Sequence, residues 1–108
     1  MRFLKAALLV SLTSGCSLSY RYISSAKAPA RAEHCDIHAL SLIPPGGYDE
    51  LGFFEFESGG ATRNTADFLQ SVGPRICAAG GDAVATELNG QGFIVRAVVL
   101  KKKSAAEQ

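Results

Sequence analysis

The sequence contains no tryptophan, one methionine and no excess of either charge, with 11 lysines and arginines against 10 aspartates and glutamates in 108 residues. A balanced charge creates no overall field that would attract nucleic acid or an anionic lipid surface. The only basic run, Lys101-Lys102-Lys103, stands beside a polar end of the chain and is interpreted as solvated terminal sequence. No nucleic-acid partner is predicted.

The motifs of several enzyme classes are also missing. No Gly-x-Ser-x-Gly segment is present to place a serine on a sharp turn, and the three glycine pairs form no phosphate-binding signature. The cysteines do not form a Cys-x-x-Cys pair, so they do not indicate thiol redox catalysis. The acidic residues of the middle of the chain are interpreted as a solvated face: Asp49, Glu50, Glu55 and Glu57. We therefore expect no enzyme activity and no cofactor.

No apolar run approaches the roughly 20 residues that a membrane-spanning helix needs. A shorter run at residues 6–12 follows the basic residues Arg2 and Lys5, and small residues come next. A basic start, a short apolar run and small residues are the three regions of a secretory signal peptide. Residues 1–15 are predicted to be such a signal.

The signal ends in Thr13-Ser14-Gly15-Cys16, which resembles the lipobox of bacterial lipoproteins, with the usual aliphatic residue displaced one place to Leu12. In that family the cysteine receives a diacylglycerol and becomes the first mature residue. The resemblance implies lipidation of Cys16 and attachment to a membrane. Ser17, a small polar residue at the sorting position, implies the outer membrane, with the domain facing the periplasm or the cell surface.

The chain has three cysteines, and an odd number in an exported protein leaves one thiol to explain. Lipidation of Cys16 would account for that thiol, so Cys35 and Cys77 are predicted to form a disulfide in an oxidising compartment. The bridge would close a loop of roughly 40 residues, for which loop-closure entropy gives about 4 kcal/mol. That contribution is comparable to the net stability of a small domain.

One small domain remains after the signal. Residues 16–33, rich in serine, alanine and arginine, are predicted to be a flexible tether, followed by a domain at residues 34–101 and a disordered tail at residues 102–108. One group in the tether suits either the domain or the membrane interface: Tyr20, Tyr22 and Ile23. Without Arg2 and Lys5 the mature chain has 9 basic and 10 acidic residues, a net charge of −1.

Two strands are expected at the start of the domain. Residues 35–43 are rich in aliphatic side chains and end at residues 44–47, Pro-Pro-Gly-Gly, which is a turn signal. In the second half of residues 48–58, phenylalanines alternate with glutamates, as in a strand with one solvated face. The two segments are predicted to form a hairpin or a neighbouring pair.

A helix is expected next, because Phe68, Val72 and Ile76 recur at helical spacing. Its cap is predicted at Thr62 or Asn64, its end at the following glycine pair, and a kink or two short helices near Val72 because of an internal proline: Pro74. Residues 82–88 and 92–101 are predicted to be two strands joined by an Asn-Gly hairpin turn, with the apolar last strand central. This order predicts an α+β domain (β-β-α-β-β), a sheet of about four strands with one helix on one face.

The segment His34-Cys35-Asp36-Ile37-His38 brings together residue types that ligate zinc or copper. In an extended strand, His34 and His38 would point to one face and Cys35 to the other. Cys35 is also the predicted partner of Cys77. No metal is therefore predicted, and His34 and His38 remain the alternative ligands.

The segment ICAAGGDAVATEL, in which a helix leads through glycines into a strand, resembles small exported β-β-α-β-β domains. One such family is the outer-membrane lipoproteins that sense stress for the Rcs phosphorelay, which have an acylated N-terminus, a linker and disulfides. The resemblance implies a non-enzymatic envelope lipoprotein that senses stress or contacts another envelope protein. Two alternatives are a periplasmic metal-binding module using His34 and His38, and a purely structural surface lipoprotein.

Overall fold

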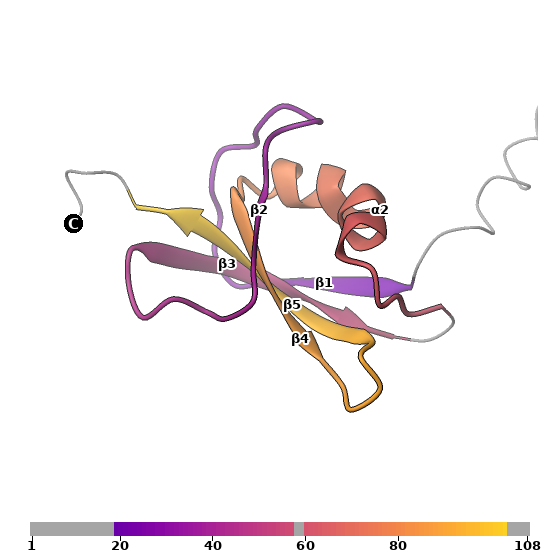
Figure 1. The fold of residues 1–108 in the computed structure, drawn as a ribbon. Coiled ribbons are helices and arrows are strands. Elements are labelled where there is room, and N and C mark those ends of the chain that lie inside the picture. The colour runs from indigo at the N-terminus through magenta and orange to yellow at the C-terminus, as the bar shows by residue number, and fades with distance from the viewer. Residues whose placement is uncertain (1–18, 58–59, 104–108) are drawn as a thin grey trace, which may run out of the picture.

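The computed structural model describes residues 19–57 and 60–103, which form a mixed five-stranded sheet with one helix on one face (Figure 1). The helix is α2, Thr65–Ala78. The strands are β1 (Tyr20–Ser24), β2 (His38–Leu40), β3 (Tyr48–Phe56), β4 (Ala83–Leu88) and β5 (Ile94–Lys102). The predicted α+β class is confirmed, with five strands in place of about four. The predicted signal peptide, Cys16 and residues 104–108 lie outside the described residues.

The strands lie in the order β1-β3-β5-β4-β2, so β5 occupies the central position that its apolar sequence predicts. β4 and β5 form the predicted antiparallel hairpin. The side chain of Asn89 fixes its turn by accepting hydrogen bonds from the backbone N–H groups of Gln91 and Phe93, at 2.9 and 3.0 Å. The Asn-Gly sequence therefore predicts this turn correctly, because the asparagine side chain forms hydrogen bonds with nearby backbone N–H groups.

The predicted pairing of the first two segments is wrong. β2 lies at the sheet edge, parallel to β4, and two strands separate it from β3. The connection between them, residues 41–47, runs below the sheet in Figure 1, on the side away from α2. The Pro-Pro-Gly-Gly sequence therefore lies in a connection that crosses from one edge of the sheet towards the other. β2 pairs with β4 instead, and the N–H of His38 donates to the carbonyl of Asp82 at 3.0 Å.

The predicted tether at residues 16–33 is also wrong in part, because residues 20–24 form β1. Tyr20 is only 5 % exposed, and its hydroxyl donates to the carbonyl of Ile94 at 2.7 Å and accepts from the N–H of Thr62 at 3.3 Å. Burial raises the pKa of Tyr20 above its usual value, which keeps the donating proton in place. The backbone of Arg31 is also bonded, to the carbonyl of Cys77. The domain therefore begins before residue 34.

The main core lies between α2 and the sheet. Phe68, Val72 and Ile76 point from the helix onto side chains of four strands. The phenylalanines of β3 and α2 and Tyr20 pack edge to face, which suits the aromatic quadrupole. α2 begins at the predicted cap Asn64 and is one continuous helix around Pro74, so the alternative of two short helices is wrong.

Replacement of Tyr20 by phenylalanine tests the role of β1. We expect Tyr20→Phe to lower the free energy of unfolding by about 1–3 kcal/mol, because the buried carbonyl of Ile94 loses its donor. Tyr22→Phe is the matched control: its hydroxyl bonds Leu51 at 3.2 Å in a half-buried place and should matter less. Urea denaturation followed by circular dichroism measures both. Equal losses in the two variants would contradict the assigned role.

Candidate functional site

A groove of about 520 Å³ runs between α2 and the segment that precedes β2. Residues 33–37 form one wall, and one side of α2 from Ala66 to Cys77 forms the other. Gly73 lines the groove opposite Ile37: a Cβ at that position would lie 3.6 Å from Ile37 Cδ1, an ordinary van der Waals contact, and a longer side chain would extend into the hollow. We call this hollow the α2 groove.

The disulfide between Cys35 and Cys77 joins the two walls, with a Cα–Cα distance of 5.9 Å. The predicted pairing is confirmed. Cys77 is only 1 % exposed in the last turns of α2, whereas Cys35 is half-buried in the opposite wall. The guanidinium of Arg31 holds the same wall by donating to the carbonyls of Asp36 and Gly81, at 3.0 and 2.8 Å.

The rim of the α2 groove is acidic and its interior is apolar. The exposed side chains of Glu33 and Asp36 stand on the rim, and no lysine or arginine is among the described residues that line the groove. Its interior surface comes from apolar side chains and the disulfide: Ile37, Leu69, Pro74, Cys35 and Cys77. The apolar interior can therefore accept an apolar side chain of a bound partner, and the acidic rim can pair with a positively charged side chain next to it.

The two histidines proposed as alternative metal ligands lie on different surfaces. His34 lines the α2 groove in a segment without regular structure, because β2 begins only at His38. His38 is paired with Ala83 and shares the side of Leu40, which packs on the sheet face away from α2. The extended strand assumed for His34 is therefore wrong. In the part of the chain that the structure describes, no three histidine, cysteine, aspartate or glutamate side chains are placed to hold a metal.

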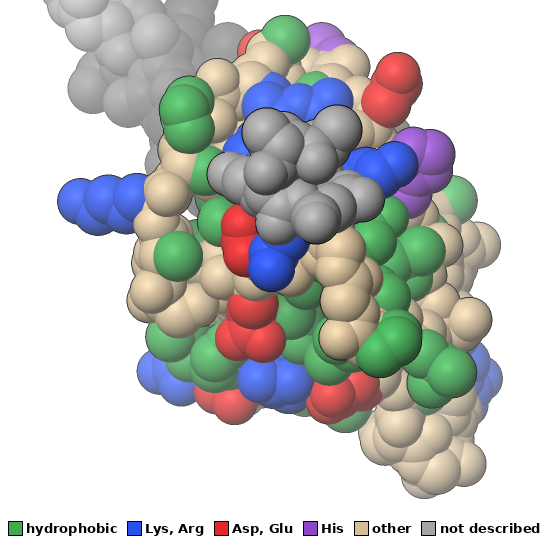
Figure 2. Space-filling view, turned by 90° about the vertical axis from the view of Figure 1, so that its left-hand side faces the viewer, with side chains coloured by type: hydrophobic (Ala, Val, Ile, Leu, Met, Phe, Trp, Pro, Cys, Tyr) green, Lys and Arg blue, Asp and Glu red, His purple; other side chains and the backbone are tan. Residues whose placement is uncertain are grey.

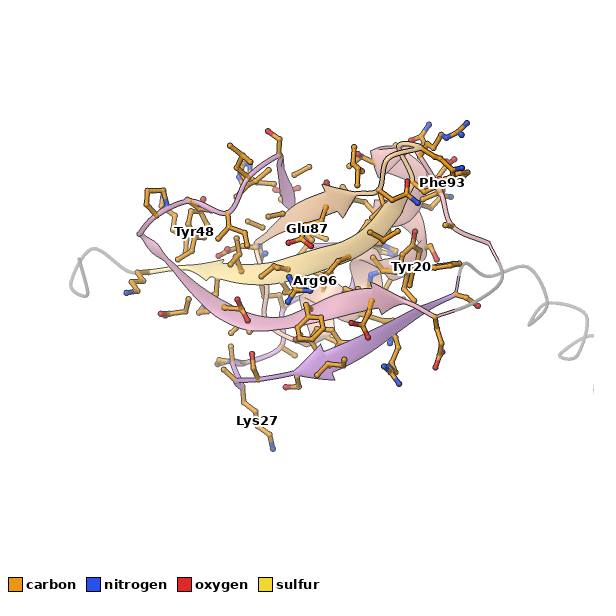
Figure 3. All side chains as sticks on the ribbon, turned by 90° about the horizontal axis from the view of Figure 1, so that it is seen from below. Tyr20, Lys27, Tyr48, Glu87, Phe93 and Arg96 are labelled. Atoms are coloured by element: carbon orange, nitrogen blue, oxygen red, sulfur yellow. A yellow bond between two sulfur atoms is a disulfide. The ribbon has the colours of Figure 1, made fainter. Side chains whose placement is uncertain are left out.

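The sheet face away from α2 carries a row of charges that the sequence only partly indicates. Arg21 pairs across the strands with Glu55, Glu55 with Arg96, and Arg96 with Glu87. Arg21 and Glu55 form an ion pair at 3.1 Å, and Arg96 and Glu87 form another at 3.3 Å. Figure 3 shows Arg96 and Glu87 side by side on this face. The alternation in β3 predicts the solvated glutamates, whereas their partners depend on strand order.

A second row on the same face is apolar. Its members pair across all five strands in the order Ile23, Phe53, Val98, Ala85 and Leu40. Val98 and Ala85 are buried although they lie away from α2, and the ring of Phe53 is covered by the guanidinium of Arg96 at 4.2 Å. The centre of this apolar row is thus buried, whereas Ile23 and Leu40 at its two ends are only partly buried.

Comparisons of the chain with protein-family models, with curated proteins and with solved structures found no match. Across residues 19–57 and 60–103, no helix is long and apolar enough to cross a membrane. What the protein does is therefore inferred from its own residues.

Removal of the disulfide tests its structural role. Cys35→Ser or Cys77→Ser should lower the melting temperature. The free energy of unfolding should fall by up to about 4 kcal/mol, because the unfolded chain regains the loop-closure entropy. The double variant should lose no more than either single variant, because both residues share one interaction. Cys16→Ser is the control and should leave the melting temperature of the domain unchanged. Additive losses at residues 35 and 77, measured by calorimetry, would contradict the shared bond.

Proposed function

We propose that the protein is a non-enzymatic lipoprotein of the bacterial envelope, anchored in the outer membrane through Cys16, whose domain contacts another envelope protein. The observation that carries the proposal is the disulfide between Cys35 and Cys77. It uses two of the three cysteines and leaves Cys16 at the end of the predicted signal. Disulfides persist in oxidising compartments, which supports export.

The α2 groove is the surface that we assign to the protein partner. Its volume of about 520 Å³ is large enough to take up an apolar side chain of a partner protein. Its acidic rim, Glu33 and Asp36, and its apolar interior suit a segment with an apolar side chain beside a lysine or arginine. The resemblance to the Rcs stress-sensor lipoproteins makes stress sensing the corresponding hypothesis for its biological role.

The metal-binding alternative has no observation in its favour, since His34 and His38 lie on different surfaces. The purely structural alternative differs from the proposal in one respect, the presence of a protein partner in the α2 groove. Fractionation tests the anchor, and crosslinking tests the partner.

Replacement of Cys16 tests the membrane anchor. We expect Cys16→Ala to move the protein from the membrane pellet to the soluble fraction, because each buried methylene of an acyl chain contributes roughly 0.8 kcal/mol to membrane binding. Cys35→Ser is the control, since it should leave the protein in the pellet. Immunoblotting of salt-washed membranes measures both. Cys16→Ala protein that is processed and still pellets would contradict the lipid anchor.

Crosslinking in intact cells tests the α2 groove. A photo-reactive amino acid at Gln70, which lines the groove, should capture a defined envelope protein, whereas the same residue at Lys27 should not. Lys27 is exposed and points away from the domain (Figure 3). Mass spectrometry of the captured peptide should show an apolar residue beside a lysine or arginine.

Two further variants decide whether the capture depends on the groove. Gly73→Leu should fill the groove and abolish crosslinking from Gln70. Gly73→Ala is the matched control and should preserve the crosslink, because it adds only a methyl at ordinary contact distance. Reversal of the rim charge by Glu33→Lys with Asp36→Lys should have the same effect as Gly73→Leu. Capture that survives both changes, or no capture at all, would contradict the assigned surface and favour the purely structural alternative.

A further inference from the structure

The described domain begins at a fixed point very close to Cys16. The N–H of Ser19 donates to the carbonyl of Gly60 at 3.5 Å, and its carbonyl accepts from the N–H of Glu57 at 3.1 Å. Ser17 and Leu18 alone separate Ser19 from Cys16. With about 3.8 Å between consecutive Cα atoms, the Cα of Cys16 lies at most about 11 Å from that of Ser19. A lipid on Cys16 would therefore hold one particular end of the domain near the membrane.

That end is formed by residues 60–63 and 88–93, which we call the hairpin end. The backbone N–H of Ile94 donates to the carbonyl of Thr62 at 2.8 Å, so the two segments are joined. Figure 3 shows the labelled residues Tyr20, at the start of β1, and Phe93, in the β4–β5 turn, at the same end of the sheet. Tyr48 and Lys27 lie at the other end in Figure 3.

The side chains of the hairpin end are amphipathic. Leu88 is 59 % exposed, and the half-buried ring of Phe93 lies 4.3 Å below the guanidinium of Arg63. Arg63 Nε also donates to the carbonyl of Gln91 at 2.9 Å. Beside them is a hollow of about 430 Å³ whose walls include Phe56 and Val95. An apolar side chain, an aromatic ring and an arginine close together suit the polar–apolar boundary of a bilayer.

The opposite end of the sheet is too far away to share this contact when the strands stand upright. Nine residues of β3 or β5 at about 3.3 Å each span about 30 Å, whereas the headgroup region is only about 5–8 Å thick. Figure 2 looks onto this opposite end, where basic, acidic and apolar side chains lie side by side. Lys102 pairs with Tyr48 there, and Lys103 Nζ lies 3.8 Å from Asp49 Oδ1. Basic side chains at this end would reach anionic lipid only if the domain lay flat.

We propose that the hairpin end lies in the headgroup region of the membrane that holds the acyl chains of Cys16, with Leu88 and Phe93 in contact with lipid. This inference rests on the proposed lipidation. α2 begins at the hairpin end, so its last turns and the disulfide lie farther from the lipid. The α2 groove then remains open to a protein partner along the side of an upright domain.

Two exposed glycines provide matched labelling sites. Gly90 lies in the turn of the hairpin end and Gly46 at the opposite end, and a Cβ at either position meets no atom within 4 Å. Because Cys35 and Cys77 are bonded, Gly90→Cys or Gly46→Cys would be the only free thiol in acylated protein. Each variant is labelled with a fluorophore and placed in phosphatidylethanolamine–phosphatidylglycerol vesicles that contain lipid with a nitroxide headgroup.

The label at Gly90→Cys should be quenched several-fold more strongly than the label at Gly46→Cys. Leu88→Asp in the Gly90→Cys background should reduce the quenching. Equal quenching at both positions, stronger quenching at Gly46→Cys, or no effect of Leu88→Asp would overturn the proposed contact. Intact mass spectrometry of the same samples separates the two proposals: an unmodified Cys16 defeats the lipoprotein proposal, whereas acylated protein with an unquenched Gly90→Cys label defeats only the orientation.

Discussion

The covalent bond between Cys35 and Cys77 is the constraint on which the groove and one sheet edge depend. It fixes the segment before β2 against the last turns of α2, and the three-residue strand β2, the packing of Ile37 and the hydrogen bonds of Arg31 add to this attachment. A domain of this size buries too little surface to hold such a segment firmly by packing alone. The bond thereby sets the width of the α2 groove as well as the position of β2.

The two faces of the sheet are stabilised by different means. On the helix side, Phe54, Phe68 and Ile76 are fully buried, and hydrophobic burial dominates. On the other side, exposed ion pairs such as Arg21–Glu55 contribute at most about 1 kcal/mol each, so they add little to the stability of the fold. In the apolar row beside them, the ring of Phe53 is covered by the guanidinium of Arg96. Apolar side chains also line the α2 groove and the hairpin end, and Leu42 and Ile43 are exposed in the connection that follows β2.

Local signals predicted the elements whose stabilising contacts are local. The helix follows from the spacing of Phe68 and Val72 and from the cap at Asn64, and the β4–β5 hairpin from Asn89. The short β1 was missed because five residues provide too little periodicity, and its stability comes from the distant contacts of Tyr20 with Ile94. Likewise, the register of β2 with β4 depends on residues more than 40 positions apart.

The candidate site was predictable only where covalent chemistry was involved. Counting the cysteines predicted the disulfide, which the structure confirms. The α2 groove could not be predicted, because Gly73 of one wall lies opposite Ile37 of the other wall, which is 36 positions earlier in the chain. The proximity of Cys16 to the domain likewise became evident only once Ser19 was found bonded to the end of β3.

Intact mass spectrometry of the protein from bacterial membranes, after alkylation without reduction, tests the central claim most directly. The lipoprotein account predicts a chain that begins at Cys16, carries the added mass of acyl chains and takes up no alkylating reagent at Cys35 or Cys77. A chain that retains residues 1–15, or one whose Cys16 carries no acyl chain, would contradict the lipid anchor, and alkylation of Cys35 or Cys77 would contradict the disulfide.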